Sequence, residues 1–166
     1  MEPILELKHI FYAYHTPDGE TRALEDISFS VREGEFIAIV GPSGCGKSTL
    51  LHLIFGLLEP EQGQINIRGS SRKDSSVRIG YMLQKDELLN WRSVYHNVLL
   101  GLEIQHRLNP RTRERAKELL KTYGLEQFAS SRPSELSGGM RQRAALIRTL
   151  VLEPDILLLD EPFSAM

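Results

Sequence analysis

Nine consecutive residues in the first third of the chain have the types and spacing of a phosphate-binding loop. They are Gly41, Pro42, Ser43, Gly44, Cys45, Gly46, Lys47, Ser48 and Thr49. Glycines let the backbone turn tightly and leave N–H groups that can surround phosphate oxygens. Lys47 can reach the β- and γ-phosphates of a nucleotide, and the Ser48 hydroxyl can bind Mg²⁺. This G-x-x-x-x-G-K-S stretch therefore predicts a nucleotide site.

A phosphate-binding loop of this kind joins a strand to a helix. The apolar run at residues 36–40 predicts the strand, and the leucine-rich residues 47–55, followed by Gly56, predict the helix. The first turn of that helix would add unpaired N–H groups and the positive end of its dipole. These flanking patterns favour a nucleotide site over the alternative, a glycine-rich turn with an incidental lysine.

A second candidate for chemistry follows the apolar run at residues 156–159, which predicts a buried strand. The next two residues are Asp160 and Glu161. Acidic residues often form turns at strand ends, but a phosphate loop in the same chain gives them a chemical role. Asp160 can hold the Mg²⁺ that bridges nucleotide phosphates. Glu161 would lie near the γ-phosphate and could polarise the attacking water as a general base.

The composition is that of a globular domain with a core. The chain has 166 residues, of which 41 % are hydrophobic, and a formal net charge of -2. This charge gives no support for a nucleic-acid partner or a polybasic membrane anchor. No apolar run reaches the length of a membrane span, and residues 1–4 lack the pattern of a secretion signal. The single cysteine, Cys45, is interpreted as a small filler in a reducing cytosol, with a redox role as the alternative.

Strand patterns dominate the first half of the chain. Besides the two strands already named, strands are predicted at residues 4–10, 23–31, 65–68 and 77–83. The proline and the Asp-Gly pair within residues 16–20 predict a turn between the first two. These two strands, so close in sequence, suggest an antiparallel sheet beside the nucleotide core. The polar residues 69–76 predict an exposed hairpin tip.

Helical patterns dominate from residue 91 onward. One apolar stripe recurs at three- or four-residue spacing, at Trp91, Val94, Val98 and Leu102. A second helix is expected over residues 111–123, with Asn109 as its cap and Gly124 at its end. Its charges alternate in sign, which favours a solvated face over an RNA-binding patch. A third helix opens at Ser137 and runs to about residue 151.

The start of this third helix carries a resemblance to a known family. The residues Leu136, Ser137, Gly138, Gly139 and Met140 resemble the LSGGQ motif of ATP-binding cassette (ABC) ATPases, with methionine in place of the usual glutamine. The order of motifs also matches that family: phosphate loop, Gln84 at a strand end, LSGG helix, then an apolar strand with Asp-Glu. A Ser-Gly-Gly helix start is also suited to an anion, because serine caps and glycines allow close approach.

The resemblance implies the fold. We expect an α/β P-loop NTPase with a RecA-like core, an N-terminal antiparallel β subdomain and an inserted α-helical subdomain at roughly residues 86–150. All of residues 1–166 would form a single ABC ATPase domain, incomplete at its C-terminus. Residues 164–166 resemble the beginning of the family's D-loop, and the later strands and the switch histidine of the family do not follow. The chain is therefore expected to be a fragment, poorly soluble or hydrolytically feeble when expressed alone.

The resemblance also implies the site. Two copies would form a head-to-tail dimer with two ATP molecules, each with Mg²⁺, at their interface. Ser137, Gly138 and Gly139 would contact the ATP of the partner subunit. Gln84 would sense Mg²⁺ and link the core to the helical part, and Tyr14 would stack on adenine, with Tyr12 and Phe11 as alternatives.

A finer resemblance concerns residues 88–98, which are similar to the L-L-x-W-x-x-V-x-x-N-V stretch of importer ATPases for nitrate, taurine and aliphatic sulfonates. This implies hydrolysis of ATP to ADP and phosphate, coupled to uptake of a small anion of that kind. The partners would be transmembrane permease subunits and, indirectly, a solute-binding protein, which places the ATPase at the cytoplasmic face of the membrane. Trp91 would line the permease-docking groove or pack in the core. The rival interpretations are a non-transport ABC module and a nucleotide-binding fragment without turnover.

Overall fold

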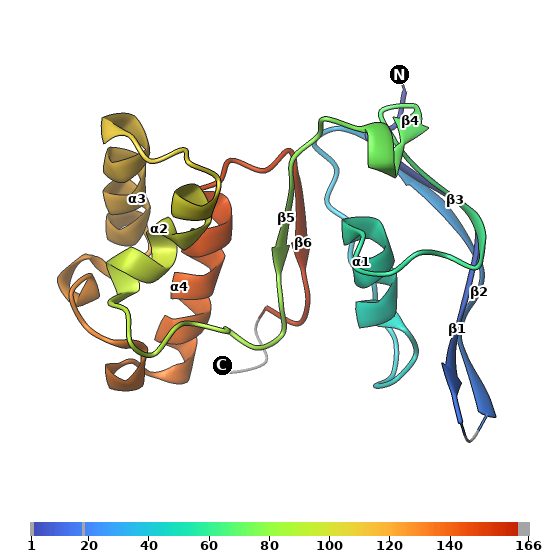
Figure 1. Ribbon diagram of the computed structural model, residues 1–166, viewed down its shortest axis with the longest axis horizontal. Coiled ribbons are helices and arrows are strands. Elements are labelled where there is room, and N and C mark those ends of the chain that lie inside the picture. Colours follow the sequence, from blue (N-terminus) through green and yellow to red (C-terminus); the bar gives the residue numbers. More distant parts are fainter. Residues whose placement is uncertain (1, 18, 163–166) are drawn as a thin grey trace. The chain divides into compact units, whose positions relative to one another are not determined.

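The computed structural model describes residues 2–17 and 19–162 (Figure 1). These residues form two compact units, which divide between Val77 and Arg78 and are described one at a time. Residues 164–166, which resemble the D-loop, lie outside the described part. Within the described part, no helix combines the length and the apolar character needed to cross a membrane.

The first unit is built on a four-stranded antiparallel sheet with the order β2-β1-β3-β4. Its strands are β1 (Leu5–Thr16), β2 (Gly19–Val31), β3 (Gln62–Ile67) and β4 (Ser70–Ser71). The predicted hairpin turn is confirmed, since Thr16 pairs with Gly19 across it. The expected antiparallel sheet forms, and its first two strands extend beyond the predicted residues. The polar stretch expected as a hairpin tip contains β4 and a short 3₁₀ helix, Arg72–Asp74.

Helix α1 (Lys47–Phe55) has the bounds that the sequence predicted. It ends at Gly56, whose φ of 97° is the left-handed conformation that suits glycine at a helix C-terminus. The core of this unit consists of apolar side chains from the strands and from α1, including the fully buried Leu7, Ile10 and Leu53. Burial of these aliphatic side chains is the main force that holds α1 in place.

The strand predicted at residues 36–40, before the phosphate loop, is not formed. These residues have no regular secondary structure, and Phe36 and Val40 are each 88 % exposed. A strand requires a neighbour to satisfy its backbone N–H and C=O groups. In residues 2–17 and 19–162 no strand pairs with this run, so its apolar composition alone does not make it extended and buried.

The second unit combines a two-stranded sheet with a helical cluster. Strands β5 (Ile79–Met82) and β6 (Ile156–Leu159) run parallel and in register, so that Ile79 pairs with Ile156 and Met82 with Leu159. A parallel pair needs a long crossover connection. Helices α2 (Val94–Ile104), α3 (Pro110–Thr122) and α4 (Gly138–Leu150) supply it, together with the 3₁₀ helices Glu126–Phe128 and Pro133–Glu135. In the strand expected to be buried, Leu158 is buried and Leu157 is exposed.

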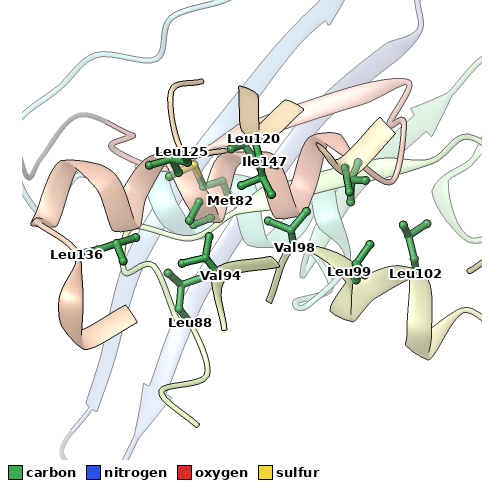
Figure 2. Close-up of a cluster of buried hydrophobic side chains, with 14 residues drawn as sticks. Met82, Leu88, Val94, Val98, Leu99, Leu102, Leu120, Leu125, Leu136 and Ile147 are labelled. Atoms are coloured by element: carbon green, nitrogen blue, oxygen red, sulfur yellow. The ribbon is translucent and has the colours of Figure 1, made fainter. Parts of the chain in front are cut away.

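The helices share one hydrophobic core, drawn in Figure 2. Its members come from α2, α3, α4, β5 and the connecting segments: Met82, Leu88, Val94, Val98, Leu99, Leu102, Ala116, Leu120, Leu125, Leu136, Ala144, Ala145, Ile147 and Val151. The predicted helix caps are confirmed. The Asn109 side chain accepts from the Thr112 backbone N–H at 3.0 Å, and the Ser137 hydroxyl accepts from the Met140 N–H at 3.3 Å.

Trp91 does not belong to the apolar stripe that was predicted to begin with it. Helix α2 begins at Val94, with Ser93 as its N-cap, and its buried stripe consists of Val94, Val98 and Leu102. Trp91 precedes the helix and is 73 % exposed. The interpretation of Trp91 as a core residue is therefore wrong. The apolar pattern placed the start of the helix about one turn too early, at Trp91. The Ser93 cap, and not the apolar pattern, sets the start of α2.

The loop that carries Trp91 is held by one buried side chain, Asn97 of α2. Its Oδ1 accepts from the Leu89 N–H at 2.7 Å, and its Nδ2 lies 3.1 Å from the Leu89 carbonyl, 3.2 Å from that of Arg92 and 3.0 Å from that of Ser93. Asn97 is fully buried. Its amide therefore hydrogen-bonds to backbone groups on both sides of Trp91 and ties the loop to α2.

We predict that Asn97→Ala lowers the free energy of unfolding by about 3 kcal/mol, because the hydrogen bonds between this buried amide and the loop backbone are lost at once. Urea denaturation followed by circular dichroism measures this. Asn90→Ala is the matched control, since Asn90 is an exposed amide in the same loop, and it should change the free energy by less than about 0.5 kcal/mol. Equal effects of the two substitutions would contradict the role assigned to Asn97.

Candidate nucleotide-binding site

At two positions the phosphate loop adopts a backbone conformation that disfavours residues with a side chain. Gly44 has a φ of 81° and Gly46 a φ of 93°. A Cβ atom at Gly46 would lie 2.5 Å from the Ala23 carbonyl oxygen and 2.9 Å from Leu24 Cδ2 on strand β2. The loop therefore packs directly on β2, and glycine at position 46 is needed both for its conformation and for space.

The start of α1 is open to an anion. Gly46 is its N-cap and has no side chain to accept from the helix's first N–H groups, and the first turn contains no acidic residue. The other three α-helices of the described chain have a side-chain cap, provided by Ser93, Asn109 and Ser137. Free N–H groups and the positive end of the helix dipole favour a bound phosphate.

Lys47 adds a positive charge to this loop. Its Nζ donates to the carbonyl oxygens of Gly41 at 3.0 Å and of Pro42 at 2.9 Å, so the ammonium group is folded over the loop. Cys45 is exposed, and its Sγ lies 3.9 Å from the same ammonium. A Cβ at Gly41 would lie 2.6 Å from that sulfur, so glycine at position 41 makes room for the cysteine.

Tyr14 lies beside the phosphate loop. Its hydroxyl is 3.0 Å from Oγ1 of the buried Thr49, and the residue is 40 % exposed. The Tyr12 ring meets it edge-on, with centroids 5.1 Å apart. Of the three aromatic candidates at this position, Tyr14 is the one with a hydrogen bond to the phosphate loop. The contact is made by Thr49, a residue of the phosphate loop for which the sequence motif gave no separate role.

In the second unit, Asp160 is held at the carboxyl end of β6. Its backbone N–H donates to the Met82 carbonyl at 3.0 Å, and its carboxylate accepts from the Tyr81 hydroxyl at 3.3 Å. Asp160 is buried. Burial first, and then the negative charge of Asp160, raise the pKa of the Tyr81 phenol, so the phenol stays protonated and donates. The sequence contained no signal for this contribution of Tyr81.

Gln84 and Glu161 meet at the same edge of the sheet. Nε2 of Gln84 donates to Oε2 of Glu161 at 2.7 Å. The contact follows from the in-register pairing of β5 with β6, because parallel strands of matching register end side by side. Glu161 has a φ of 47°, a left-handed conformation that is costly for a residue with a side chain and that recurs at functional sites.

The LSGG residues begin α4. Ser137 is exposed and caps the helix, while Gly138 and Gly139 are half-buried.

Gly138 and Gln84 line the same open cleft of about 460 Å³, together with Asp86, Asn90 and Arg141 among others. Met140, which stands where the family motif has glutamine, packs against the helical core rather than into open space.

Comparison with known proteins identifies the family. A family model described as "ABC transporter" matches residues 24–164. This chain belongs to the ABC transporter family. An uncharacterized ABC transporter ATP-binding protein of Bacillus subtilis, YtlC, is 48 % identical over 98 % of this chain and 62 % of its own length. The taurine import ATP-binding protein TauB of Rhizobium johnstonii is 43 % identical, over 98 % of this chain and 63 % of its own length.

Solved structures of ABC cassettes have the same fold. A dimeric post-hydrolysis structure of the ATP-binding cassette MJ0796, bound to ADP and Pi, superposes with a TM-score of 0.87 at 34 % identity, over 98 % of this chain and 75 % of that one. The structure of cbiO1 from Clostridium perfringens superposes with a TM-score of 0.82 at 31 % sequence identity, and the match covers 100 % of this chain and 68 % of that one. The α/β fold of P-loop ATPase cassettes is thus confirmed. The chain spans less than two thirds of the length of its curated ABC relatives.

The two glycines at positive φ provide a test of the loop. Gly44→Ala adds a side chain in open space, whereas Gly46→Ala also pushes a methyl group into β2. We expect both to lose about 1 kcal/mol of unfolding free energy to backbone strain, and Gly46→Ala to lose about 2 kcal/mol more to the clash. Thermal and urea unfolding measure the difference. If the two variants were equally stable, the contact of the loop with β2 would be wrong.

Proposed function

We propose that this ABC protein binds and hydrolyses ATP as the nucleotide-binding subunit of an importer. The observation that carries the proposal is the phosphate loop: α1 begins at a glycine without a side-chain cap, and Lys47 lies over the loop. The proposed ATP-binding residues are the loop residues 41–49, with Tyr14 against the adenine and Gln84 toward the metal. Each role is assigned from the residue's motif and from its own local geometry.

The donor set fits Mg²⁺, a small ion that prefers oxygen ligands and takes one or two carboxylates together with phosphates and water. The proposed ligands are the Ser48 hydroxyl, the Asp160 carboxylate and the Gln84 amide oxygen. Among residues 2–17 and 19–162, no group of three or more His, Cys, Asp and Glu side chains forms a self-sufficient metal cage. When bound with ATP, Mg²⁺ would neutralise phosphate charge.

Glu161 is the proposed general base. Its carboxylate is exposed and accepts one hydrogen bond, from Gln84, and the second oxygen can accept a proton from an attacking water. The buried Asp160, in contrast, is held by Tyr81 and by the backbone, which suits a fixed ligand. The adjacent carboxylates thus have environments that support different roles.

A head-to-tail dimer is proposed for the working state. Ser137, Gly138 and Gly139 would meet the ATP of the partner subunit at the N-terminus of α4, a helix of 13 residues. The dimeric MJ0796 cassette, at 34 % identity, supports an assembly of two copies. Residues 86–150, which include α2, α3 and α4, are the proposed helical subdomain of a single ABC ATPase domain.

The relatives support an importer of small oxyanions. Proteins named for taurine import and aliphatic sulfonate import are 43 % and 48 % identical to this chain, and one named for sulfate/thiosulfate import is 46 % identical. We infer a nitrate-, sulfonate- or taurine-like solute, a permease partner and, indirectly, a solute-binding protein. The protein would sit at the cytoplasmic face of the membrane through the permease, and no nucleic acid is involved.

Two substitutions in the intact protein separate binding from hydrolysis. Lys47→Ala should weaken ATP binding by roughly 100-fold, because a hydrogen bond to a charged group contributes up to about 3 kcal/mol. Glu161→Gln should bind ATP normally, hydrolyse it at least roughly 100-fold more slowly as expected for loss of a general base, and accumulate as an ATP-bound dimer. Calorimetry, phosphate release and size-exclusion chromatography measure these outcomes. Lys73→Ala, an exposed lysine with an ion pair to Glu59, is the control.

The proposed function fails if the intact protein has no affinity for Mg-ATP. If Glu161→Gln hydrolysed ATP at the parent rate, the assignment of the general base alone would be wrong.

The exposed Trp91 provides a test of the permease partner. The rigid loop that Asn97 fixes presents this indole to solvent, and large aromatic side chains dominate the binding energy of protein interfaces. Trp91→Ala should weaken binding to the permease in detergent by roughly 30-fold, since a hot-spot residue contributes about 2 kcal/mol, and leave ATP affinity unchanged. Ile104→Ala, with a side chain 69 % exposed in the same unit, is the matched control. Equal binding by both variants would exclude Trp91 from the interface.

A further inference from the structure

Two arginines of α4 hold the chain segment that follows Gln84. The Arg148 guanidinium donates through Nη2 to the Asp86 carbonyl at 2.7 Å and through Nη1 to the Glu87 carbonyl at 2.8 Å. Arg141 donates through Nε to the Asp86 carboxylate at 3.2 Å and through Nη1 to the Leu136 carbonyl at 2.9 Å. Asp86 is therefore bound to α4 by both its backbone and its side chain.

The contact of Arg148 matches the shape of the guanidinium group. Its planar fork presents two N–H donors at a fixed spacing, and here they reach the carbonyls of two successive residues. Partial burial of this group lowers the pKa of Arg148, and the nearby Asp86 and Glu87 act in the opposite direction. A cation removed from water in this way is stable only when it is well hydrogen-bonded.

The held segment has a backbone that it would not adopt by itself. Glu87 has a φ of 46°, in the left-handed region that disfavours residues with a side chain. Such conformations persist only where surrounding contacts impose them. The Arg148 hydrogen bond to the Glu87 carbonyl is one such contact, and the Leu88 N–H bond to the Asp86 carboxylate, at 3.2 Å, is another.

This segment joins the two groups of proposed site residues in the second unit. Gln84, two residues before Asp86, is bonded to Glu161 at 2.7 Å. The Leu136 carbonyl that Arg141 holds is immediately before Ser137, the cap of α4. Gln84, Asp86, Gly138 and Arg141 line one cleft. A displacement of α4 would therefore be passed to Gln84 through residues 86 and 87.

We propose that Arg148 is a positioning residue for ATP hydrolysis, which fixes residues 86–87 on α4 and thereby fixes where Gln84 meets Glu161. The inference rests on the proposed function. Arg148 itself touches neither Gln84 nor Glu161 in any hydrogen bond of the described chain, so it acts through the segment. Its removal should lower the rate of hydrolysis and leave the affinity for ATP unchanged.

A double-mutant cycle on the intact protein tests this. In the parent, Arg148→Met should lower kcat roughly tenfold, the scale expected when a catalytic group is misplaced by a fraction of an ångström. The Kd for ATP measured without Mg²⁺ should change less than about twofold, since Gln84 is proposed to act on the metal and the phosphate loop is untouched. In a Gln84→Ala background the same substitution should lower kcat by less than about twofold, because the group that it positions is already gone.

Arg143→Met is the matched control. Arg143 lies on the same helix and also donates to a backbone carbonyl, that of Tyr123 at 2.9 Å, which is not part of the segment. It should leave kcat unchanged in both backgrounds. Arg148→Lys guards against a folding defect: it keeps the charge and the aliphatic stem, but a single ammonium does not reproduce the fork, so kcat should be intermediate.

Hydrogen–deuterium exchange gives a readout that needs no activity. Amides 86–89 should exchange faster in Arg148→Met than in the parent or in Arg143→Met. If these amides exchanged at the parent rate in Arg148→Met, the claim that Arg148 holds residues 86 and 87 on α4 would be wrong. If Arg148→Met lowered kcat by the same factor in the parent and in the Gln84→Ala background, the positioning role would be wrong. If the parent binds no ATP or hydrolyses none, the proposed function fails instead, and the exchange experiment still tests whether Arg148 holds residues 86 and 87.

Discussion

The in-register parallel pairing of β5 with β6 is the constraint on which the second unit depends. Because Met82 pairs with Leu159, the chain leaves both strands at the same edge, and Gln84 and Glu161 meet there. Parallel strands cannot be joined by a short turn, so the connection must leave the sheet and return. That connection contains the helical core of Figure 2 and the LSGG helix start.

The phosphate loop depends on a different principle, the omission of side chains. At α4 a serine satisfies the first N–H groups of the helix, whereas at α1 a glycine leaves them without a side-chain acceptor. The same glycine lets the loop lie against the Ala23 carbonyl. One residue type thus provides both close packing on β2 and an anion-binding helix start.

The proposed site residues are supported by contacts that lie between segments distant in sequence. Asn97 fixes the loop around Trp91, Tyr81 donates to Asp160, and Arg148 holds residues 86 and 87. Arg148 lies within α4, and no motif or period in the sequence marks it as a residue with distant partners. The sequence pattern did not name those partners.

Local rules determined what the sequence alone could predict. The bounds of α1 and the caps Asn109 and Ser137 follow from interactions within a few residues, such as capping and glycine conformations. The apolar run at residues 156–159 predicted the residues of β6, but not its parallel pairing with β5. Motif order also identified the family. Tertiary structure alone decided the rest. Residues 36–40 are apolar but form no strand in the described chain, and Trp91 continues a helical period but is exposed, because pairing and burial depend on partners that are remote in sequence.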